Sequence, residues 1–472
     1  MANFSRVIPL VVASALFMEN TDSTVIATSL PAIAADLGQD PVILKLAFTT
    51  YLLALTVFIP ISGWCADRFG ARNVFRAAIA VFTLGSIACG LSTSLEGLIG
   101  ARALQGMGGA MMVPVGRLII LRTVAKAEMV SALAVLTIPA LLGPLLGPPL
   151  GGFITTYFHW RWIFWINVPV GLLGLALATI YMPDIREEGV PPLDVPGFFL
   201  SAIGLSALVF GATVFGRDVL PPYGAPVLIV VGIALTALYV WHARRTTNPI
   251  LNLKLMDIAT FRSGTMGGSL FRVGVGAMPF LLPLMLQLGF KLTPFQSGSL
   301  TCAAALGALT MKITAARILR RFGFRSVLVV NGLVSAATLA LQALFTPETP
   351  HLLILAVLLA GGFFRSLQFT SLNALSYSDV PQREMGTATS LYSVAQQLSL
   401  AAGIVVAASV LEFAQYMRGD LTLAVSDFAY AFFAVAIISA FSVLSHLKLS
   451  PDAGSEVSGR VAPVQENGGL KA

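Results

Sequence analysis

Long apolar runs separated by short polar segments fill the chain from residue 8 to residue 446. A helix that crosses a bilayer needs about 20 mostly apolar residues. The pattern therefore predicts an all-α polytopic membrane protein with fourteen transmembrane helices, at residues 8–30, 42–63, 74–93, 97–119, 130–154, 163–182, 195–215, 224–241, 264–288, 296–316, 327–345, 352–372, 387–411 and 425–446.

Composition supports a bilayer environment over a soluble fold. The 472 residues are 56% hydrophobic and only 11% charged, with a mean hydropathy of +0.85. Soluble chains carry about 25% charged residues. The net charge of +7 does not indicate a nucleic-acid partner, because the basic residues form short clusters between apolar runs.

Those basic clusters predict the orientation of the chain. Cytoplasmic loops are enriched in Lys and Arg. One side receives the cluster at 68–76 and the cluster at 317–325, whereas the other receives few basic residues. We therefore expect a multi-pass protein of the bacterial cytoplasmic membrane with both termini in the cytoplasm. The acidic loop Asp184–Asp194 fits this orientation poorly.

The cysteines and histidines indicate no metal site. Cys65, Cys89 and Cys302 have no paired spacing, and the four histidines are scattered. We find no nucleotide-binding loop and no Ser-His-Asp pattern, so the sequence does not predict an enzyme. The expected energy source is the proton gradient, with no cofactor.

Two carboxylates lie inside the first apolar run. Glu19 and Asp22 are three residues apart and therefore share one helix face. Acids in a spanning helix indicate function and need a partner. At 1.5 Å per residue, Asp22 lies roughly 21 Å and Arg102 roughly 25 Å from the cytoplasmic ends of their helices. We predict that Arg102 pairs with Asp22 or Glu19 and that these residues couple transport to protons; the alternative is a static ion pair.

An internal repeat divides the chain. The segment 66–72, ADRFGAR, recurs as LRRFGFR at 319–325, each time after the second helix of its half. Internal repeats are typical of secondary transporters. We predict an N-terminal six-helix bundle at 1–190, two inserted helices at 191–245, a C-terminal six-helix bundle at 246–449 and a disordered cytoplasmic tail at 450–472.

Two glycine-containing motifs accompany the repeat. In the first loop, glycines allow close approach and positive φ, which predicts a conformational switch formed by Gly63, Asp67, Arg68, Gly70 and Arg72; the alternative is a plain basic loop. The fifth span presents a face of small residues that lets helices pack closely. Its motif comprises Gly143, Pro144, Gly147, Pro148, Gly151 and Gly152.

Polar residues also interrupt the apolar runs of the second half. Buried polar groups need partners. They either bind substrate or cross-link helices, and the arginines are the stronger functional candidates because a charge at membrane depth is the most costly. The candidate substrate-binding residues are Arg272, Gln287, Arg365, Gln368 and Gln396.

Together these motifs resemble the major facilitator superfamily, specifically the fourteen-helix drug:proton antiporters. The resemblance covers nearly the whole chain and implies that segment 63–72 is the switch loop, segment 102–108 the proton-coupling motif and segment 143–152 the antiporter motif. Segment 22–31 is similar to the family's first-helix DxTxxNxxLP motif, and segment 160–171 to a stretch common in this subfamily. Ala27 and Ser29 depart from that first-helix motif, and Arg320 stands where the first half has Asp67.

The resulting hypothesis is a proton-coupled antiporter that exports drugs or other small amphipathic compounds from the cytoplasm as a monomer. The alternative within the same fold is an exporter of a specific metabolite or organic anion, which Arg272 and Arg365 favour. A membrane-bound enzyme or passive pore is a third class, and no motif supports it.

Overall fold

Helices form all of the regular structure in the described part of the chain. The computed structural model describes residues 4–123, 129–186, 190, 192–215, 220–221, 223–381, 384–420 and 422–455. The first half contains α1 (Phe4–Val25), η1 (Ile26–Ser29), α2 (Leu30–Leu37), α3 (Lys45–Phe69), α4 (Ala71–Leu91), α5 (Leu95–Thr123), α6 (Met129–Tyr157), α7 (Trp162–Trp165) and α8 (Asn167–Tyr181).

The second half follows two intermediate helices, α9 (Val195–Val214) and α10 (Gly224–Arg245). Its elements are η3 (Leu253–Asp257), α11 (Ala259–Arg262), η4 (Ser263–Gly267), α12 (Gly268–Leu284), η5 (Met285–Gly289), α13 (Pro294–Gln342), α14 (His351–Ser378), α15 (Met385–Arg418) and α16 (Val425–His446).

Each predicted span is helical over most of its length, although some, such as 42–63 and 327–345, extend up to three residues beyond the helix. Among the described residues, eleven helices are long and apolar enough to cross a membrane. The predicted spans at 8–30, 130–154 and 296–316 correspond to α1–α2, α6 and the first part of α13. The number fourteen for membrane crossings stays a prediction.

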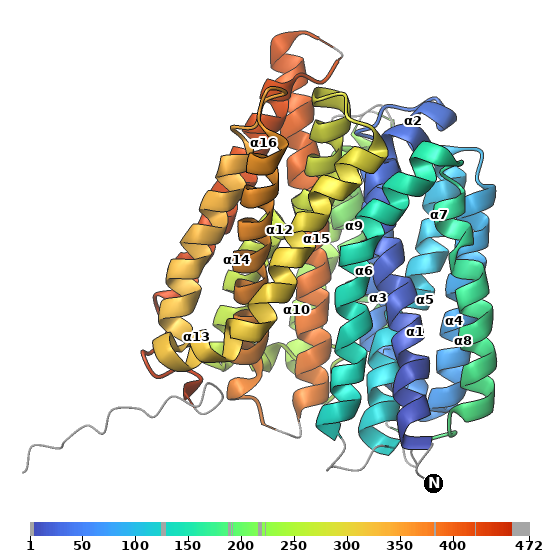
Figure 1. Cartoon of the computed structure of the whole chain (residues 1–472). Coiled ribbons are helices and arrows are strands. Elements are labelled where there is room, and N and C mark those ends of the chain that lie inside the picture. Colours follow the sequence, from blue (N-terminus) through green and yellow to red (C-terminus); the bar gives the residue numbers. More distant parts are fainter. Residues whose placement is uncertain are drawn as a thin grey trace, which may run out of the picture.

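The two halves form neighbouring bundles (Figure 1). We name α1–α8 the first bundle and α11–α16 the second bundle. Helix α6 packs against α13, and α3 packs against α15, so these pairs join the bundles. Helices α9 and α10 pack on each other, and α9 contacts both α3 and α15. The domain boundaries at 190, 245 and 449 stay predictions.

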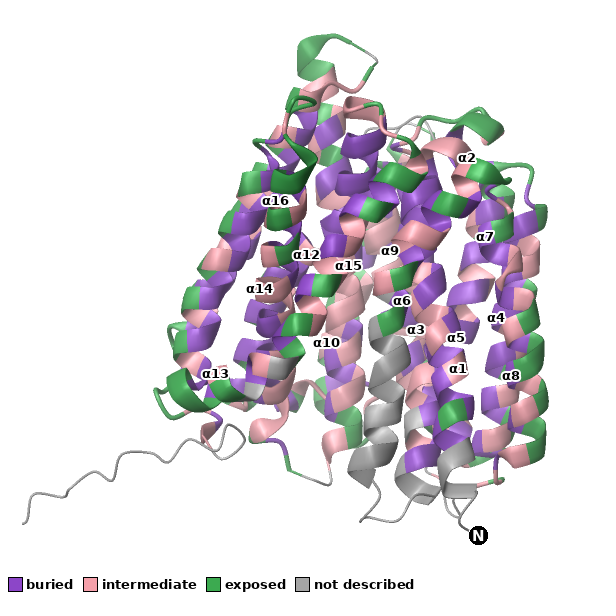
Figure 2. Cartoon of the chain, viewed as in Figure 1, coloured by how far each residue is buried: buried purple, intermediate pink, exposed green. Residues whose placement is uncertain are grey.

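Apolar side chains remain exposed on the outer helices (Figure 2). Helix α10 is the clearest case, since Val227, Val230 and Ile233 are all more than half exposed. In water such a surface would be unfavourable, but in a bilayer it contacts lipid tails. The burial pattern therefore agrees with the composition of the chain.

The internal repeat is also visible in the backbone. Gly70 joins α3 to α4 with φ +90°, and Gly323 interrupts α13 with φ +73°. Side chains with a Cβ rarely adopt this region, so glycine is required at both turns. A glycine with positive φ thus follows the second helix of each half. In the second half, Gly323 separates the two spans predicted within α13.

The described part of the chain extends beyond α16 to residue 455. Residues 451–454 form turns, and Gly454 lies against the ring of Phe324. The predicted polar tail is therefore packed at its start. Residues 456–472 lie outside the described residues.

Candidate proton-coupling site

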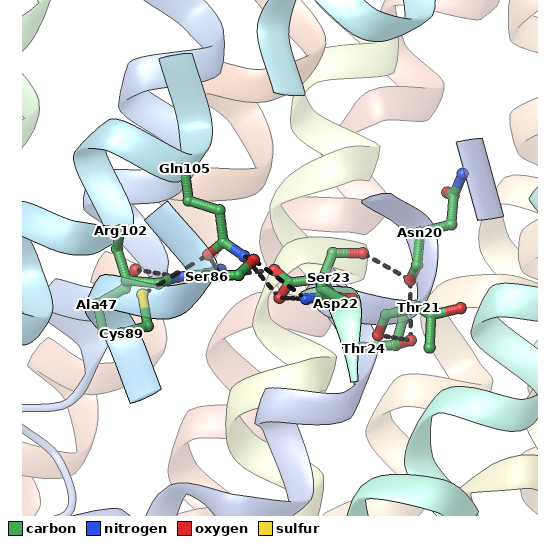
Figure 3. Close-up of polar contacts among 11 residues, drawn as sticks. Asn20, Thr21, Asp22, Ser23, Thr24, Ala47, Ser86, Cys89, Arg102 and Gln105 are labelled. Carbon is green, nitrogen blue, oxygen red and sulfur yellow. Dashed lines mark hydrogen bonds and ion pairs between the residues drawn. The ribbon is translucent and has the colours of Figure 1, made fainter. Parts of the chain in front are cut away.

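Asp22 of α1 and Arg102 of α5 form a buried ion pair (Figure 3). Arg102 Nη1 donates a hydrogen bond to Asp22 Oδ2 at 2.6 Å, and the two side chains are 0% and 1% exposed. The structure thus brings together the two residues that their matched depths predict to be partners. Their role in proton coupling stays a prediction.

Two amide side chains complete the environment of the Asp22 carboxylate. Gln105 Nε2 and Asn167 Nδ2 each donate to Asp22 Oδ1 at 2.8 Å. Both amides also donate to Ser86 Oγ of α4, at 2.8 Å from Gln105 and 3.3 Å from Asn167. Four helices therefore contribute to one polar cluster inside the first bundle.

Sequence reasoning assigned no role to Gln105, Asn167 or Ser86. A signal existed for Gln105, because residues three apart share a helix face and Gln105 follows Arg102 by three. Asn167 is an amide within an apolar run and needs a buried partner. Ser86 offers no such signal, since a serine in a spanning helix usually bonds its own backbone.

Arg102 is held by further contacts beyond the ion pair. Its Nη1 also donates to Gln105 Oε1 at 2.5 Å, and its Nε donates to the Ala47 carbonyl at 3.4 Å. The guanidinium carbon lies 4.2 Å from the centre of the Tyr51 ring, a cation–π geometry. Only Nη2 has no hydrogen-bond partner among the described residues. The arginine is thus held by residues of α3 and α5 as well as by the acid of α1.

The donors to Asp22 come from helices other than its own. The carboxylate accepts three hydrogen bonds, one on Oδ2 and two on Oδ1. Two of the donors belong to α5 and one to α8. A movement of α1 relative to these helices would therefore break the contacts of the carboxylate.

Glu19, the second predicted acid, lies one turn earlier on the same helix. It is half-buried, and its charge acts on Tyr51, the ring stacked on Arg102. Asp22, not Glu19, makes the direct contact with Arg102. The structure thus favours Asp22 as the direct partner and keeps Glu19 within electrostatic reach.

The glycines of α6 bring that helix against the acid-bearing segment. A Cβ added at Gly143 would lie 2.6 Å from Asn20 Cβ, and one at Gly147 would lie 1.9 Å from Thr24 Oγ1. Thr24 Oγ1 in turn donates to the Gly143 carbonyl at 3.2 Å. The chain immediately before and after Asp22 therefore packs directly against α6.

The same motif also joins the two bundles. Added Cβ atoms would meet Val25 O at Gly151 (2.4 Å) and Pro294 O at Gly152 (2.4 Å). The Pro148 carbonyl accepts a hydrogen bond from a threonine of η1 at 3.4 Å. The side chain of Pro144 lies outside the described part of the structure.

The predicted switch loop packs against the segment that follows α8. A Cβ at Gly70 would lie 2.3 Å from Asp184 Oδ1, and Ala71 N donates to the Ile185 carbonyl at 2.9 Å. The acidic segment thus lies beside the basic loop, which explains acids at that end of the molecule. The expectation of close approach is wrong for Gly63, which is exposed within α3 with open space around it.

The charged residues of the switch motif lie in the last turn of α3 and the first turn of α4. Asp67 and Arg72 are partly exposed, and Arg68 is exposed. Asp67 takes part in an interaction, so it is not a free charge. Switching by these residues stays a prediction.

The polar residues of the second half separate into two groups. Gln287 Nε2 donates to the Thr28 carbonyl at 3.0 Å, across the bundles. Gln368 donates to the Leu328 carbonyl at 3.0 Å and accepts from Asn331 at 2.9 Å. These glutamines cross-link helices in this conformation.

The other group comprises Arg272, which is completely buried, and Arg365 and Gln396, which are half-buried. Neither arginine forms an ion pair within the described ranges. Substrate binding by any of the five predicted residues stays a prediction.

Comparison with known proteins agrees with this architecture. The sequence model of the Major Facilitator Superfamily matches residues 12–404 and 264–466. Proteins named "Putative multidrug resistance protein MdtD" are 37% identical in Pectobacterium atrosepticum and 36% identical in Salmonella paratyphi A. Each alignment spans 444 residues and 94% of this chain, covering 95% and 94% of the respective relatives.

Solved structures show the same fold at low sequence identity. A D-xylose–proton symporter superposes with a TM-score of 0.68 at 15% identity, covering 95% of this chain and 98% of that one. The human organic anion transporter MFSD10 (TETRAN) gives 0.61 at 16% identity, covering 93% and 99%. With the family match over most of its length and curated relatives above 30% identity, this chain belongs to the Major Facilitator Superfamily.

Proposed function

We propose that the protein exports small amphipathic or cationic compounds from the bacterial cytoplasm in exchange for protons. Family membership makes it a multi-pass membrane transporter and not an enzyme, and its bacterial relatives support a location in the inner membrane. The name of those relatives supports drug-like substrates. The observation that carries proton exchange is the buried Asp22–Arg102 pair.

The proposed cycle follows from that pair. In this conformation three donors from α5 and α8 hold the Asp22 carboxylate. A shift of α1 along the glycine face of α6 separates the pair and leaves a carboxylate that takes a proton from the outside. Substrate release accompanies this step, and return of the proton to the cytoplasm restores the ion pair. Each cycle therefore exchanges a proton for a substrate.

The contacts between the bundles support an inward-facing state. Lys45, at the start of α3, pairs with Glu412, near the end of α15, at 2.5 Å. At the same end Phe295 N donates to Thr156 Oγ1 at 3.0 Å, and a Cβ at Gly298 would lie 2.1 Å from the Pro148 carbonyl. The Gly70 and Gly323 turns lie at the opposite end. We therefore assign the joined end to the outside, with both termini in the cytoplasm.

We expect one chain to suffice for transport, because both bundles and the acid cluster belong to it. The partners are then the bilayer, protons and the small-molecule substrate, with the proton gradient in place of a cofactor.

The test is ethidium efflux from cells that express the chain, with and without a protonophore. We expect efflux that the protonophore abolishes and that Asp22→Asn eliminates while the variant still inserts. Glu19→Gln reports whether the second acid contributes. Asp36→Asn is the matched control, since Asp36 pairs with Arg161 at 2.7 Å but is partly exposed.

Unimpaired efflux by Asp22→Asn would remove this residue from the mechanism. Transport that continued unchanged after collapse of the gradient would instead support a passive facilitator.

A second candidate is the export of a specific metabolite or organic anion. It is favoured by Arg272 and Arg365, neither of which has a carboxylate partner in the described part of the chain. One saturable organic-acid substrate, together with no change in drug resistance, would select this candidate.

A further inference from the structure

Three cationic side chains of the second bundle lie on or against α14 between residues 365 and 370. Lys312 Nζ donates to Thr370 Oγ1 at 2.8 Å. The guanidinium carbon of Arg272 lies 5.3 Å from the centre of the Phe369 ring. Arg365 precedes Phe369 by four residues and so lies on the same face of α14. The cations come from α12, α13 and α14, which are separate helices.

These cations lie at similar depths in the membrane. At 1.5 Å per residue, Arg272 and Arg365 lie roughly 20 Å, and Lys312 roughly 16 Å, from the cytoplasmic ends of their helical segments. A charge at this depth is costly unless it is paired or hydrated. Lys312 is nevertheless exposed. Among the described residues its ammonium donates to a neutral hydroxyl, that of Thr370.

Arg272 is the most unusual of the three. Its side chain is completely buried, yet Nε and Nη1 have no hydrogen-bond partner in the described part of the molecule. Its Nη2 donates to the Tyr392 hydroxyl, and its guanidinium carbon lies 4.6 Å from the centre of the Tyr392 ring. Aromatic rings therefore hold the guanidinium while two of its nitrogen atoms remain unbonded.

No acid neutralises the cluster among the described residues. None of the ion pairs there includes Arg272, Arg365 or Lys312. Arg365 has only a neutral acceptor, the Gly361 carbonyl, at 3.2 Å from its Nε. In the first bundle, by contrast, Arg102 has Asp22. The second bundle therefore has three positive charges at depth and lacks the anion that would balance them.

We propose that Arg272, Arg365 and Lys312 form a binding site for the carboxylate of an exported compound. This inference rests on the proposed export function and adds organic anions and zwitterions to its substrates. A guanidinium binds a carboxylate through two parallel N–H donors, and the lysine ammonium adds a point charge. In a zwitterion, the positive group is attracted to the first bundle, where Glu19 and Asp22 lie.

The test measures binding to the purified full-length chain in detergent, without a proton gradient. Fluorescence anisotropy follows carboxyfluorescein as the anionic probe and ethidium as the cationic probe. We expect Arg272→Gln and Lys312→Gln each to weaken carboxyfluorescein binding about tenfold, by loss of a charge-assisted hydrogen bond. Ethidium binding should change less than about twofold.

Arg262→Gln is the matched control. Arg262 is an exposed arginine of α11 whose guanidinium contacts only a backbone carbonyl, that of Met256, among the described residues. The Arg262→Gln variant should bind both probes as the wild type does. If Arg272→Gln fails to fold, the exposed Lys312 still decides the outcome.

Wild-type protein that does not bind carboxyfluorescein would overturn the proposal. The proposal would also be overturned if Arg272→Gln and Lys312→Gln weakened the binding of both probes equally, or weakened the binding of neither. Failure of proton coupling would appear only in the protonophore efflux experiment, because the binding measurement uses no gradient. The two proposals therefore fail independently.

Discussion

Substitution of Asp22 by Asn tests stability and transport together. Asn keeps the shape of the side chain and retains one oxygen. That oxygen can still accept from Gln105 and Asn167, which both bond Oδ1 in the native protein. The amide nitrogen then takes the place of Oδ2, opposite Arg102 Nη1, so that two donors face each other. Arg102 is left buried without its counter-charge.

The size of the effect follows from burial. Removing one partner of a buried ion pair costs about 3–5 kcal/mol of folding free energy. Arg102 keeps its contacts with Gln105, Ala47 and Tyr51, so we expect the lower end, about 3 kcal/mol. The matched pair Asp36–Arg161 has nearly the same length, 2.7 Å, but exposures of 36% and 20%. Asp36→Asn should therefore cost only about 0–1 kcal/mol.

The measurement is denaturant unfolding of the purified variants in detergent, beside protonophore-sensitive efflux from cells. The double variant Asp22→Asn/Arg102→Gln removes both charges and should recover much of the lost stability, because no unpaired charge remains buried. It should still fail to export, because it lacks Asp22, the proposed proton carrier. Stability and transport are thereby separated.

The reasoning is refuted if Asp22→Asn and Asp36→Asn lose the same stability, since burial would then not govern the pair. Normal proton-dependent efflux by the double variant would refute the transport role.

Two further predictions concern the contacts between helices. Glu412→Gln should loosen the outer end of the bundles, because it removes the charge that pairs with Lys45, which is buried at 1% exposure. The charge swap Lys45→Glu/Glu412→Lys should restore closure. Cysteine cross-linking across that end measures both effects, and equal cross-linking in the wild type and the two variants would contradict the assignment. Gly147→Ala should cost about 1–3 kcal/mol and impair efflux, because its Cβ would lie 1.9 Å from a hydroxyl oxygen of α1. Gly100→Ala, with open space at its Cβ, is the control for the unfolding measurement, and equal destabilisation of the two would contradict close packing of α6 on α1.

Particular residues show how far sequence reasoning reaches. The pairing of Asp22 with Arg102 was predictable because distance along a helix gives membrane depth. The turn at Gly70 was predictable because few residues other than glycine tolerate its backbone. Gly63, in the same motif, was not predictable in this way. The sequence pattern does not say which of its glycines packs closely against another segment, and Gly63 has open space around it.

The sequence by itself determined the membrane environment, the helical spans and the depth of each buried charge. These properties depend on local hydrophobicity and on a constant rise per residue. Only the tertiary structure decided that Gln105, Asn167 and Ser86 surround Asp22, and that Lys45 meets Glu412 across the bundles. Contacts between helices depend on how each helix is rotated and which neighbour it packs against, and packing of the whole chain decides both.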